Sequence, residues 1–453
     1  MSKPRVIVIG GGPAGMMAAG RAAECGADVV LLEKGPKLAR KLRISGKGRA
    51  NISNTADLND FIEAFAPNGK FLYGAFSRFF RDDLLDLLRR FGVETKIERG
   101  GRVFPVSDRA ADVADALERW IESVGVRVKP NCRARSIAVA DNKVAGVDIY
   151  GGRMNADAVV IATGGASYPK TGSTGDGYAM ARELGHTIVT PEPALSAMVT
   201  KEDWVRNLQG LSLKNVEASL VIEQQSARED ASEGFPRQSI SRPTATLRGK
   251  KPPEASPSSL SGKKIASEFG EMLFTHFGVS GPIILTLSRS ARAHLKTDSV
   301  AVCIDLKPAL SEEQLHARLI RDFTQTRHFA NYLHGLLPRL MVDVFAYLTG
   351  IDPAKPINTI TADQRARIVR LLKCLNVTVT ALGPLEEAIV TAGGVPIGEI
   401  DPKTMMSKLV DGLFLAGEVI DIDAETGGFN LQAAFSTGYV AGESAARSAS
   451  DPV

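Results

Sequence analysis

Val6-Ile7-Val8-Ile9-Gly10-Gly11-Gly12-Pro13-Ala14-Gly15 is the stretch that decides the fold of this chain. Its four leading apolar residues predict a buried strand, and the residues from Gly15 to about Cys25 predict a helix. The glycines satisfy the pattern GxGxxG. Gly10 makes the tight turn off the strand, Gly12 lets a pyrophosphate approach the backbone, and Gly15 lets the helix pack closely on the strand.

The residues around this turn complete a nucleotide-binding βαβ unit. Pro13 and Ala14 lie between Gly12 and the predicted helix, whose unpaired N–H groups favour phosphate binding, and both are assigned to the cofactor site. A second apolar run, Val29-Val30-Leu31-Leu32, ends at Glu33, which is followed by Lys34. A carboxylate there accepts hydrogen bonds from ribose hydroxyls and repels a 2′-phosphate, so NADP is disfavoured. We assign both residues to the cofactor site, and the motif alone leaves FAD and NAD open.

Three later segments favour FAD. Ile161-Ala162-Thr163-Gly164-Gly165 resembles the ATG stretch of two-dinucleotide-type flavoproteins, where the chain doubles back past the cofactor. Gly412-Leu413-Phe414-Leu415-Ala416-Gly417-Glu418 resembles their second FAD fingerprint, in which the acid meets the ribityl and pyrophosphate region. Gly427-Gly428-Phe429-Asn430-Leu431-Gln432 opens a final helix, whose N–H groups can face the flavin N1–C2=O edge. The residues assigned to the cofactor here are Thr163, Gly164, Gly417, Glu418, Asn430 and Leu431.

A family resemblance rests on blocks spread over nearly the whole chain. Lys41-Leu42-Arg43-Ile44-Ser45-Gly46-Lys47-Gly48-Arg49-Ala50-Asn51 resembles the SGxGR(C/A)N signature of the BaiN/aminoacetone-oxidase family of flavoproteins. Residues 165–177, 273–282 and 391–395 match it as well. The resemblance implies non-covalent FAD and an FAD domain interrupted by a β-barrel-like domain and a small helical domain. It implies an oxidoreductase, and family activities include oxidation of a small aminoketone and reduction of steroid-type carbon–carbon double bonds.

The signature block supplies four further cofactor candidates. Arg49 is a plausible cation for the pyrophosphate or a flavin carbonyl, and Asn51 can bond the ribityl chain or the isoalloxazine edge. Lys41 and Gly48 are assigned to the same set. The chain departs from the family at Ala50, where many members carry cysteine, and at Met406, where many carry an acid.

The fold class expected is α/β, with a Rossmann-like domain that is split along the chain. Residues 1–190 and 375–453 form it, and residues 191–310 form a β-rich insertion. Residues 311–374 form a helical subdomain. Within the insertion, residues 224–262 are rich in Ser, Pro, Arg and Lys, which predicts a flexible loop. That tract looks expanded relative to a compact family barrel.

The composition of the chain limits the classes of molecule that it is expected to bind. The net charge is +4, and residues 226–264 alone carry eight basic and four acidic side chains, so the rest of the chain is balanced. This is one local basic tract rather than a broad nucleic-acid footprint. No apolar run is long enough for a membrane helix. Four scattered cysteines without CxxC spacing argue against a disulfide framework, a metal site or a redox pair. We expect a cytoplasmic protein with a small-molecule substrate and neither nucleic acid nor membrane as partner.

The expected chemistry is hydride transfer at flavin N5, as amine oxidation or ene reduction. No catalytic residue is assigned. His276 is the best-placed histidine, whereas Tyr168 and Asp176 are expected to shape the pocket and His186 to end a helix over 178–186. Since no second GxGxxG is flanked by strand and helix, NAD(P)H would bind only transiently.

Two alternatives remain open from the sequence. One is an RNA-modifying flavoprotein that contacts RNA through residues 226–264, and the other is a flavin-binding regulator without turnover. The sequence leaves the substrate, the electron acceptor or donor, and the oligomeric state undefined.

Overall fold

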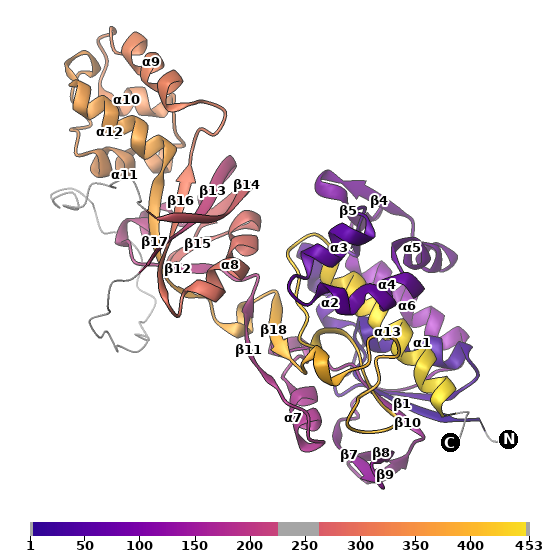
Figure 1. Ribbon diagram of the computed structural model, residues 1–453. Coiled ribbons are helices and arrows are strands. Elements are labelled where there is room, and N and C mark those ends of the chain that lie inside the picture. The colour runs from indigo at the N-terminus through magenta and orange to yellow at the C-terminus, as the bar shows by residue number, and fades with distance from the viewer. Residues whose placement is uncertain (1–2, 225–261, 450–453) are drawn as a thin grey trace. The chain divides into compact units, whose positions relative to one another are not determined.

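The structure, a computed structural model, describes residues 3–224 and 262–449, which form two compact units (Figure 1). Within the described residues, the first unit comprises residues 3–194 and 384–449, and the second comprises the remainder. The sequence assigned residues 375–382 to the nucleotide domain, but they belong to the second unit as a barrel strand. Apart from its two end residues, the predicted flexible loop over 224–262 lies outside the described residues.

A parallel sheet in the order β19-β10-β1-β2-β6 forms the centre of the first unit. The middle strands are continuous runs of buried apolar residues, as expected of a parallel sheet that is covered on both faces. The predicted strand–helix–strand unit is confirmed as β1, α1 and β2, with β1 paired to β2 in parallel register. The bounds are β1 Arg5–Ile9, α1 Pro13–Glu24, β2 Asp28–Leu32, β6 Arg127–Lys129, β10 Ala158–Ile161 and β19 Leu413–Leu415.

Helix α13, Phe429–Ser448, packs directly against α1. Two glycines one helical turn apart make this contact close. A β-carbon at Gly438 would lie 2.3 Å from the carbonyl oxygen of Ala14, and one at Gly442 would lie 2.1 Å from that of Ala18. The two helix backbones therefore touch where these glycines lie, and this fixes the C-terminal helix beside the glycine turn.

Substitution of Gly442 by leucine is expected to destabilise the protein by about 2 kcal/mol, because the side chain meets backbone that cannot move aside. Urea unfolding followed by circular dichroism measures the change. Ser448→Leu, at an exposed position in the last turn of the same helix, serves as the control. Equal stability of the two variants would contradict the close packing.

Smaller elements complete the first unit. Helices α4 and α5 are separated by a break at Phe79 and Phe80. The helices are α2 Arg40–Gly48, α3 Leu58–Ala64, α4 Tyr73–Arg78, α5 Arg81–Arg90, α6 Ala110–Ser123 and α7 Asp176–Glu183. Three small sheets are antiparallel, namely β3-β5-β4, β7-β8-β9 and β11-β18. Their strands are β3 Ser53–Asn54, β4 Thr95–Glu98, β5 Arg102–Pro105, β7 Ala134–Ala140, β8 Lys143–Ile149, β9 Gly152–Asn155, β11 Val189–Ala194 and β18 Val390–Gly394.

The second unit contains the β-barrel that the sequence predicted. It is a closed barrel in the order β12-β15-β14-β13-β16-β17. Helix α8 was not predicted, and the residues expected in a separate helical subdomain share one apolar core with the barrel. The strands are β12 Met198–Thr200, β13 Ser212–Gln224, β14 Lys263–Phe274, β15 Gly278–Ser280, β16 Asp298–Asp305 and β17 Leu375–Leu382. The helices are α8 Pro282–His294, α9 Glu312–Asp322, α10 Phe329–His334, α11 Arg339–Thr349 and α12 Ala362–Lys373.

The expectation that the cysteines form no disulfide is wrong for one pair. Cys303 and Cys374 are joined, with their α-carbons 4.9 Å apart. Cys303 lies on β16, and Cys374 immediately precedes β17, the antiparallel neighbour of β16. Because 71 residues separate the two cysteines, only the strand pairing reveals that they meet. Cys25 and Cys132 are free thiols.

Candidate functional site

The predicted cofactor residues follow the carboxyl ends of four strands of the parallel sheet. Gly10 follows β1, Glu33 follows β2, Thr163 comes just after β10, and Glu418 lies three positions after the end of β19. Parallel strands place these ends along one edge, which is where ligands of open α/β sheets bind. The fold thus brings together segments that are far apart in the sequence.

The glycine turn has the steric character that a diphosphate site requires. A β-carbon at Gly10 would lie 2.5 Å from the carbonyl oxygen of Ala162, and one at Gly15 would lie 1.8 Å from that of Gly10. A β-carbon at Gly12, in contrast, would meet nothing within 4 Å. No side chain caps α1, and its first turn holds no acid. Open space therefore adjoins free N–H groups at the positive end of a helix, which suits an anion.

Glu33 and Lys34 are held by contacts with the loops on either side. The Glu33 carboxylate accepts hydrogen bonds from the backbone N–H groups of Gly11, at 2.9 Å, and Gly35, at 2.7 Å. The Lys34 ammonium group contacts Thr174 Oγ1 at 2.5 Å and Asp176 Oδ2 at 2.9 Å. Burial raises the pKa of Asp176, but the Lys34 and Thr174 bonds more than offset it, so the pKa lies below its usual value.

A hollow of about 600 Å³ lies beside Asp176. Sequence reasoning expected Asp176 to shape a pocket but missed the other walls, since only the fold brings the start of β7 to helix α7. The backbone N–H of Cys132 donates to the Glu33 carbonyl oxygen, which ties this wall to the end of β2. The lining residues are Asn131, Cys132, Arg133, Ala134, Arg135, Tyr150, Asp176, Ala179 and Met180.

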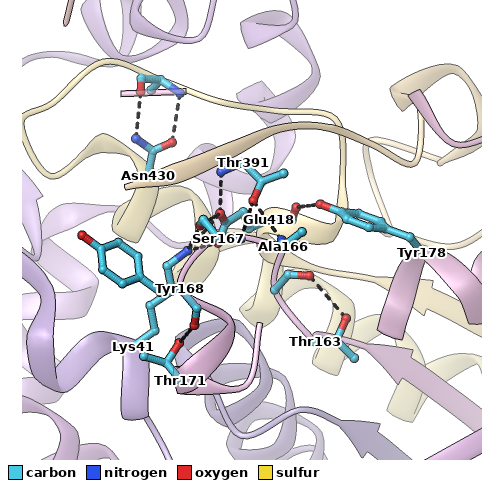
Figure 2. A network of polar contacts seen from close by, with 12 residues as sticks. Lys41, Thr163, Ala166, Ser167, Tyr168, Thr171, Tyr178, Thr391, Glu418 and Asn430 are labelled. Atoms are coloured by element: carbon cyan, nitrogen blue, oxygen red, sulfur yellow. Dashed lines mark hydrogen bonds and ion pairs between the residues drawn. The ribbon is translucent and has the colours of Figure 1, made fainter. Parts of the chain in front are cut away.

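A polar network centred on Glu418 connects four chain segments (Figure 2). The Lys41 ammonium group lies 2.8 and 3.0 Å from the two Glu418 carboxylate oxygens and 2.6 Å from Ser167 Oγ. The backbone N–H of Thr391 donates to Glu418 at 2.8 Å. The Thr391 hydroxyl oxygen accepts from the N–H groups of Ala166 and Ser167. The network anchors the loop after β10 to the end of β19.

The ionisation of Glu418 follows from these contacts. Burial raises the pKa of Glu418. The Lys41 charge and the hydrogen bonds from Lys41 and Thr391 lower it by more than burial raises it, so the pKa lies below its usual value. Glu418 is therefore ionised at neutral pH. Sequence reasoning assigned Lys41 and Glu418 to the cofactor separately, and the structure joins them as an ion pair.

Helix α2 is kinked from Ser45 to Lys47, and residues 45–51 have a concentration of left-handed backbone. Gly46, Lys47, Gly48 and Ala50 all have positive φ angles, which are uncommon outside functional sites for residues other than glycine. A β-carbon at Gly48 would meet nothing within 4 Å. The side-chain oxygen of Asn51 is buried, and no described residue donates a hydrogen bond to it. An unsatisfied buried acceptor fits a ligand with N–H or O–H donors, and FAD offers both in its ribityl chain and its flavin ring.

Arg49 is engaged elsewhere. Its guanidinium binds the carboxylates of Glu98 and Asp108 and lies 4.2 Å from the centre of the Phe104 ring. The hydrogen bonds that Arg49 donates, chiefly to Glu98 and then to Asp108, raise the pKa of Arg49. Contact with a phosphate would require Arg49 to leave both carboxylates, so the structure gives its predicted role no support.

The start of α13 combines a left-handed glycine with a pinned asparagine. Gly428, with φ 103°, precedes the helix, and no side chain caps it. The Asn430 amide exchanges hydrogen bonds of 2.9 Å with the backbone of Ala424, so it shapes the preceding loop. Asn54, which sequence reasoning missed, donates to the Gly427 carbonyl oxygen at 2.9 Å. Leu431 packs against the core of the unit.

The histidines singled out by the sequence lie outside this network. His276 is exposed in the second unit, between β14 and β15. Helix α7 ends at Glu183, before His186, so the expected helix-end position is wrong. His186 is buried, with Nδ1 2.7 Å from Glu399 and Nε2 2.9 Å from Ser407, and it braces two loops. Met405 is fully buried.

Comparisons with known proteins identify a Rossmann-domain family and two relatives that match over nearly the whole chain. A family model described as the HI0933-like protein Rossmann domain matches residues 4–444. A 3-dehydro-bile acid delta(4,6)-reductase from Clostridium scindens is 29% identical, and the match covers 98% of this chain and 99% of the relative. A ribosomal RNA dihydrouridine synthase from Escherichia coli is 26% identical, covering 97% of each chain.

Among solved structures, the open conformation of a flavocytochrome c3 fumarate reductase superimposes with a TM-score of 0.51. It is 18% identical, and the match covers 99% of this chain and 79% of that one. At this identity the likeness is one of fold. Among residues 3–224 and 262–449, no helix combines the length and the apolar character that a membrane crossing requires.

Proposed function

The chain belongs to the HI0933-like Rossmann-domain family and is an FAD-dependent oxidoreductase, and we propose that it reduces a carbon–carbon double bond conjugated to a carbonyl group. One observation carries this proposal. Two relatives matched over almost their whole length differ in substrate but share a reaction type by name. A delta(4,6)-reductase of a 3-oxo bile acid and a dihydrouridine synthase both saturate a double bond next to a carbonyl.

The chain's own residues have defined tasks in this reaction. When bound, FAD supplies the hydride that is added to the carbon β to the carbonyl. The open space at Gly12 and the uncapped start of α1 suit the diphosphate, and Glu33 suits the ribose hydroxyls. Asn51 offers an unsatisfied acceptor to the cofactor. The uncapped start of α13 presents N–H groups to negative charge.

The hydride must come from a donor that leaves after each turnover. The described residues carry one glycine turn between a strand and a helix with the nucleotide pattern, at Gly10 to Gly15, and we assign that turn to FAD. A reduced nicotinamide would therefore visit transiently from the substrate side.

Anaerobic mixing separates ene reduction from amine oxidation. We expect NADH or NADPH to bleach the flavin spectrum of the purified protein. A 3-oxo-4,6-diene bile acid should then restore the spectrum with one equivalent consumed per flavin. Aminoacetone should leave the oxidised spectrum unchanged. Bleaching by aminoacetone together with no response to either nicotinamide would contradict the proposal and indicate an amine oxidase.

A second candidate is reduction of uridine in ribosomal RNA. The E. coli relative bearing that name favours it, as does the concentration of net charge in residues 226–264. Incubation of unmodified ribosomal RNA with the reduced protein, followed by nucleoside mass spectrometry, tests it. A uridine heavier by two hydrogen atoms would favour this candidate, and a steroid product without any RNA product would exclude it.

A further inference from the structure

Tyr168 has an unusual backbone conformation for an aromatic residue. Its φ of 52° and ψ of 57° lie in the left-handed region, and Tyr168 is the one aromatic side chain among the described residues with a positive φ. The next residue is Pro169, and a residue before proline is further restricted toward extended backbone. Such a conformation persists only where the surroundings impose it.

The surroundings of Tyr168 do impose it. Its N–H donates to the carbonyl oxygen of Glu386 at 3.1 Å. Its own carbonyl oxygen accepts from the Thr171 N–H at 2.8 Å and from the Thr171 hydroxyl at 2.7 Å. The preceding residue, Ser167, is buried and fixed by Lys41 and Thr391. Residues held this firmly in a strained conformation cluster at active sites.

The phenol of Tyr168 is free to meet a ligand. The side chain is half-buried, yet none of the described residues forms a hydrogen bond with its hydroxyl group. Figure 2 shows the ring extending away from the network around Glu418, with no contact drawn to its oxygen. Two other buried phenols do form hydrogen bonds: Tyr178 donates to the Glu418 carbonyl oxygen, and Tyr332 donates to the Asp322 carboxylate. Buried or half-buried tyrosine hydroxyls usually have a partner, so this one is available to an outside molecule.

Tyr168 follows a residue that contacts the network around Glu418. Ser167 Oγ lies 3.3 Å from Glu418, and Glu418 follows the edge strand β19. Tyr168 is one peptide further along the chain. The backbone of Tyr168 therefore lies next to the network that ends the sheet, in the same unit as the glycine turn, and its ring extends away from that network.

We propose that Tyr168 is the proton donor in the reduction, and this rests on the proposed function. Reduction of a conjugated double bond forms two C–H bonds. The β-carbon receives the hydride supplied by the reduced cofactor, and the α-carbon receives the proton from Tyr168 Oη. The π bond of the alkene is lost, and the phenolate regains a proton from water. The electrons come from the reduced nicotinamide that precedes this step.

Tyr168→Phe removes one oxygen atom and leaves the ring and the backbone in place. We expect the reoxidation of the reduced protein by a 3-oxo-4,6-diene bile acid to slow by about 100-fold or more. Reduction of the flavin by NADH or NADPH should change less than about twofold, because that step needs no proton donor. Tyr73→Phe, which alters a phenol that is 59% exposed on α4, is the control and should retain both rates.

A second readout does not depend on turnover. In protein labelled with [13C]-tyrosine at Cζ, the resonance that Tyr168→Phe removes should shift when the dienone is added to the oxidised protein. The Tyr73 resonance should stay in place. Unchanged reoxidation in Tyr168→Phe, or a Tyr168 resonance that ignores the dienone, would overturn the proposal while leaving the reductase function intact. Failure of the wild-type protein to reduce either the dienone or uridine would instead overturn the proposed function.

Discussion

Gly12→Asp is expected to lower FAD affinity by about 1000-fold while leaving the apoprotein folded, because like charges held together in a binding site cost several kcal/mol. A β-carbon at Gly12 enters open space, so the fold has room for the new side chain. Its carboxylate, however, would lie where the uncapped start of α1 favours a diphosphate. Titration of the apoprotein with FAD, followed by flavin fluorescence, measures the affinity.

A matched control separates charge from backbone effects in this experiment. Gly398 is also open, with nothing within 4 Å of an added β-carbon, and it lies outside the cofactor edge. Gly398→Asp should bind FAD as the wild type does. The apoproteins of both variants should melt within a few degrees of the wild type. Wild-type FAD affinity in Gly12→Asp would show that the diphosphate binds elsewhere.

Removing one partner of the Lys41–Glu418 ion pair is expected to lower the free energy of unfolding substantially. Lys41→Met leaves a largely buried carboxylate without its cation, which should destabilise the protein by about 3 kcal/mol. Glu418→Gln should have a similar cost, since it leaves the ammonium group unpaired. The double variant should lose less than the sum of the two, because neither charge then remains buried alone. Urea unfolding of all four proteins gives the coupling energy, and strict additivity would contradict the ion pair.

The same pair predicts how stability depends on pH. The folded-state pKa of Glu418 lies below its unfolded value, so the unfolded chain binds more protons in acid. The stabilisation is present above the ordinary glutamate pKa of about 4.3 and is lost as the pH falls through the folded value. The wild-type protein should therefore lose stability on acidification below about pH 4.3, and Glu418→Gln should lose less over that range.

Local sequence patterns were sufficient to predict the nucleotide-binding strand–helix–strand unit. The apolar run before Gly10, the glycine spacing and the acid at Glu33 each follow from neighbouring residues, and the structure contains β1, α1 and β2 where they were expected. The sequence likewise indicated that a barrel interrupts the Rossmann-like fold. The nucleotide unit could be predicted because it is set by residues close together in the chain, whereas the barrel was implied by the family resemblance.

The features that the sequence did not reveal depend on contacts between distant residues. The Cys303–Cys374 disulfide joins neighbouring barrel strands, and the spacing of the cysteines in the sequence does not predict it. The role of Arg49 at a phosphate stays a prediction, and its contacts with Glu98 on β4 and with Asp108 after β5 were not visible in the sequence. The role proposed for Tyr168 rests on a backbone angle and on a hydroxyl that has no partner among the described residues, and neither can be read from residue types.

The most direct test of the central claim is a crystal structure of the protein purified with FAD. The diphosphate is predicted to lie against the start of α1 beside Gly12, and the Asn51 side-chain oxygen is predicted to accept a hydrogen bond from the cofactor. A diphosphate bound away from α1, or an Asn51 oxygen that still lacks a donor in the complex, would contradict the account.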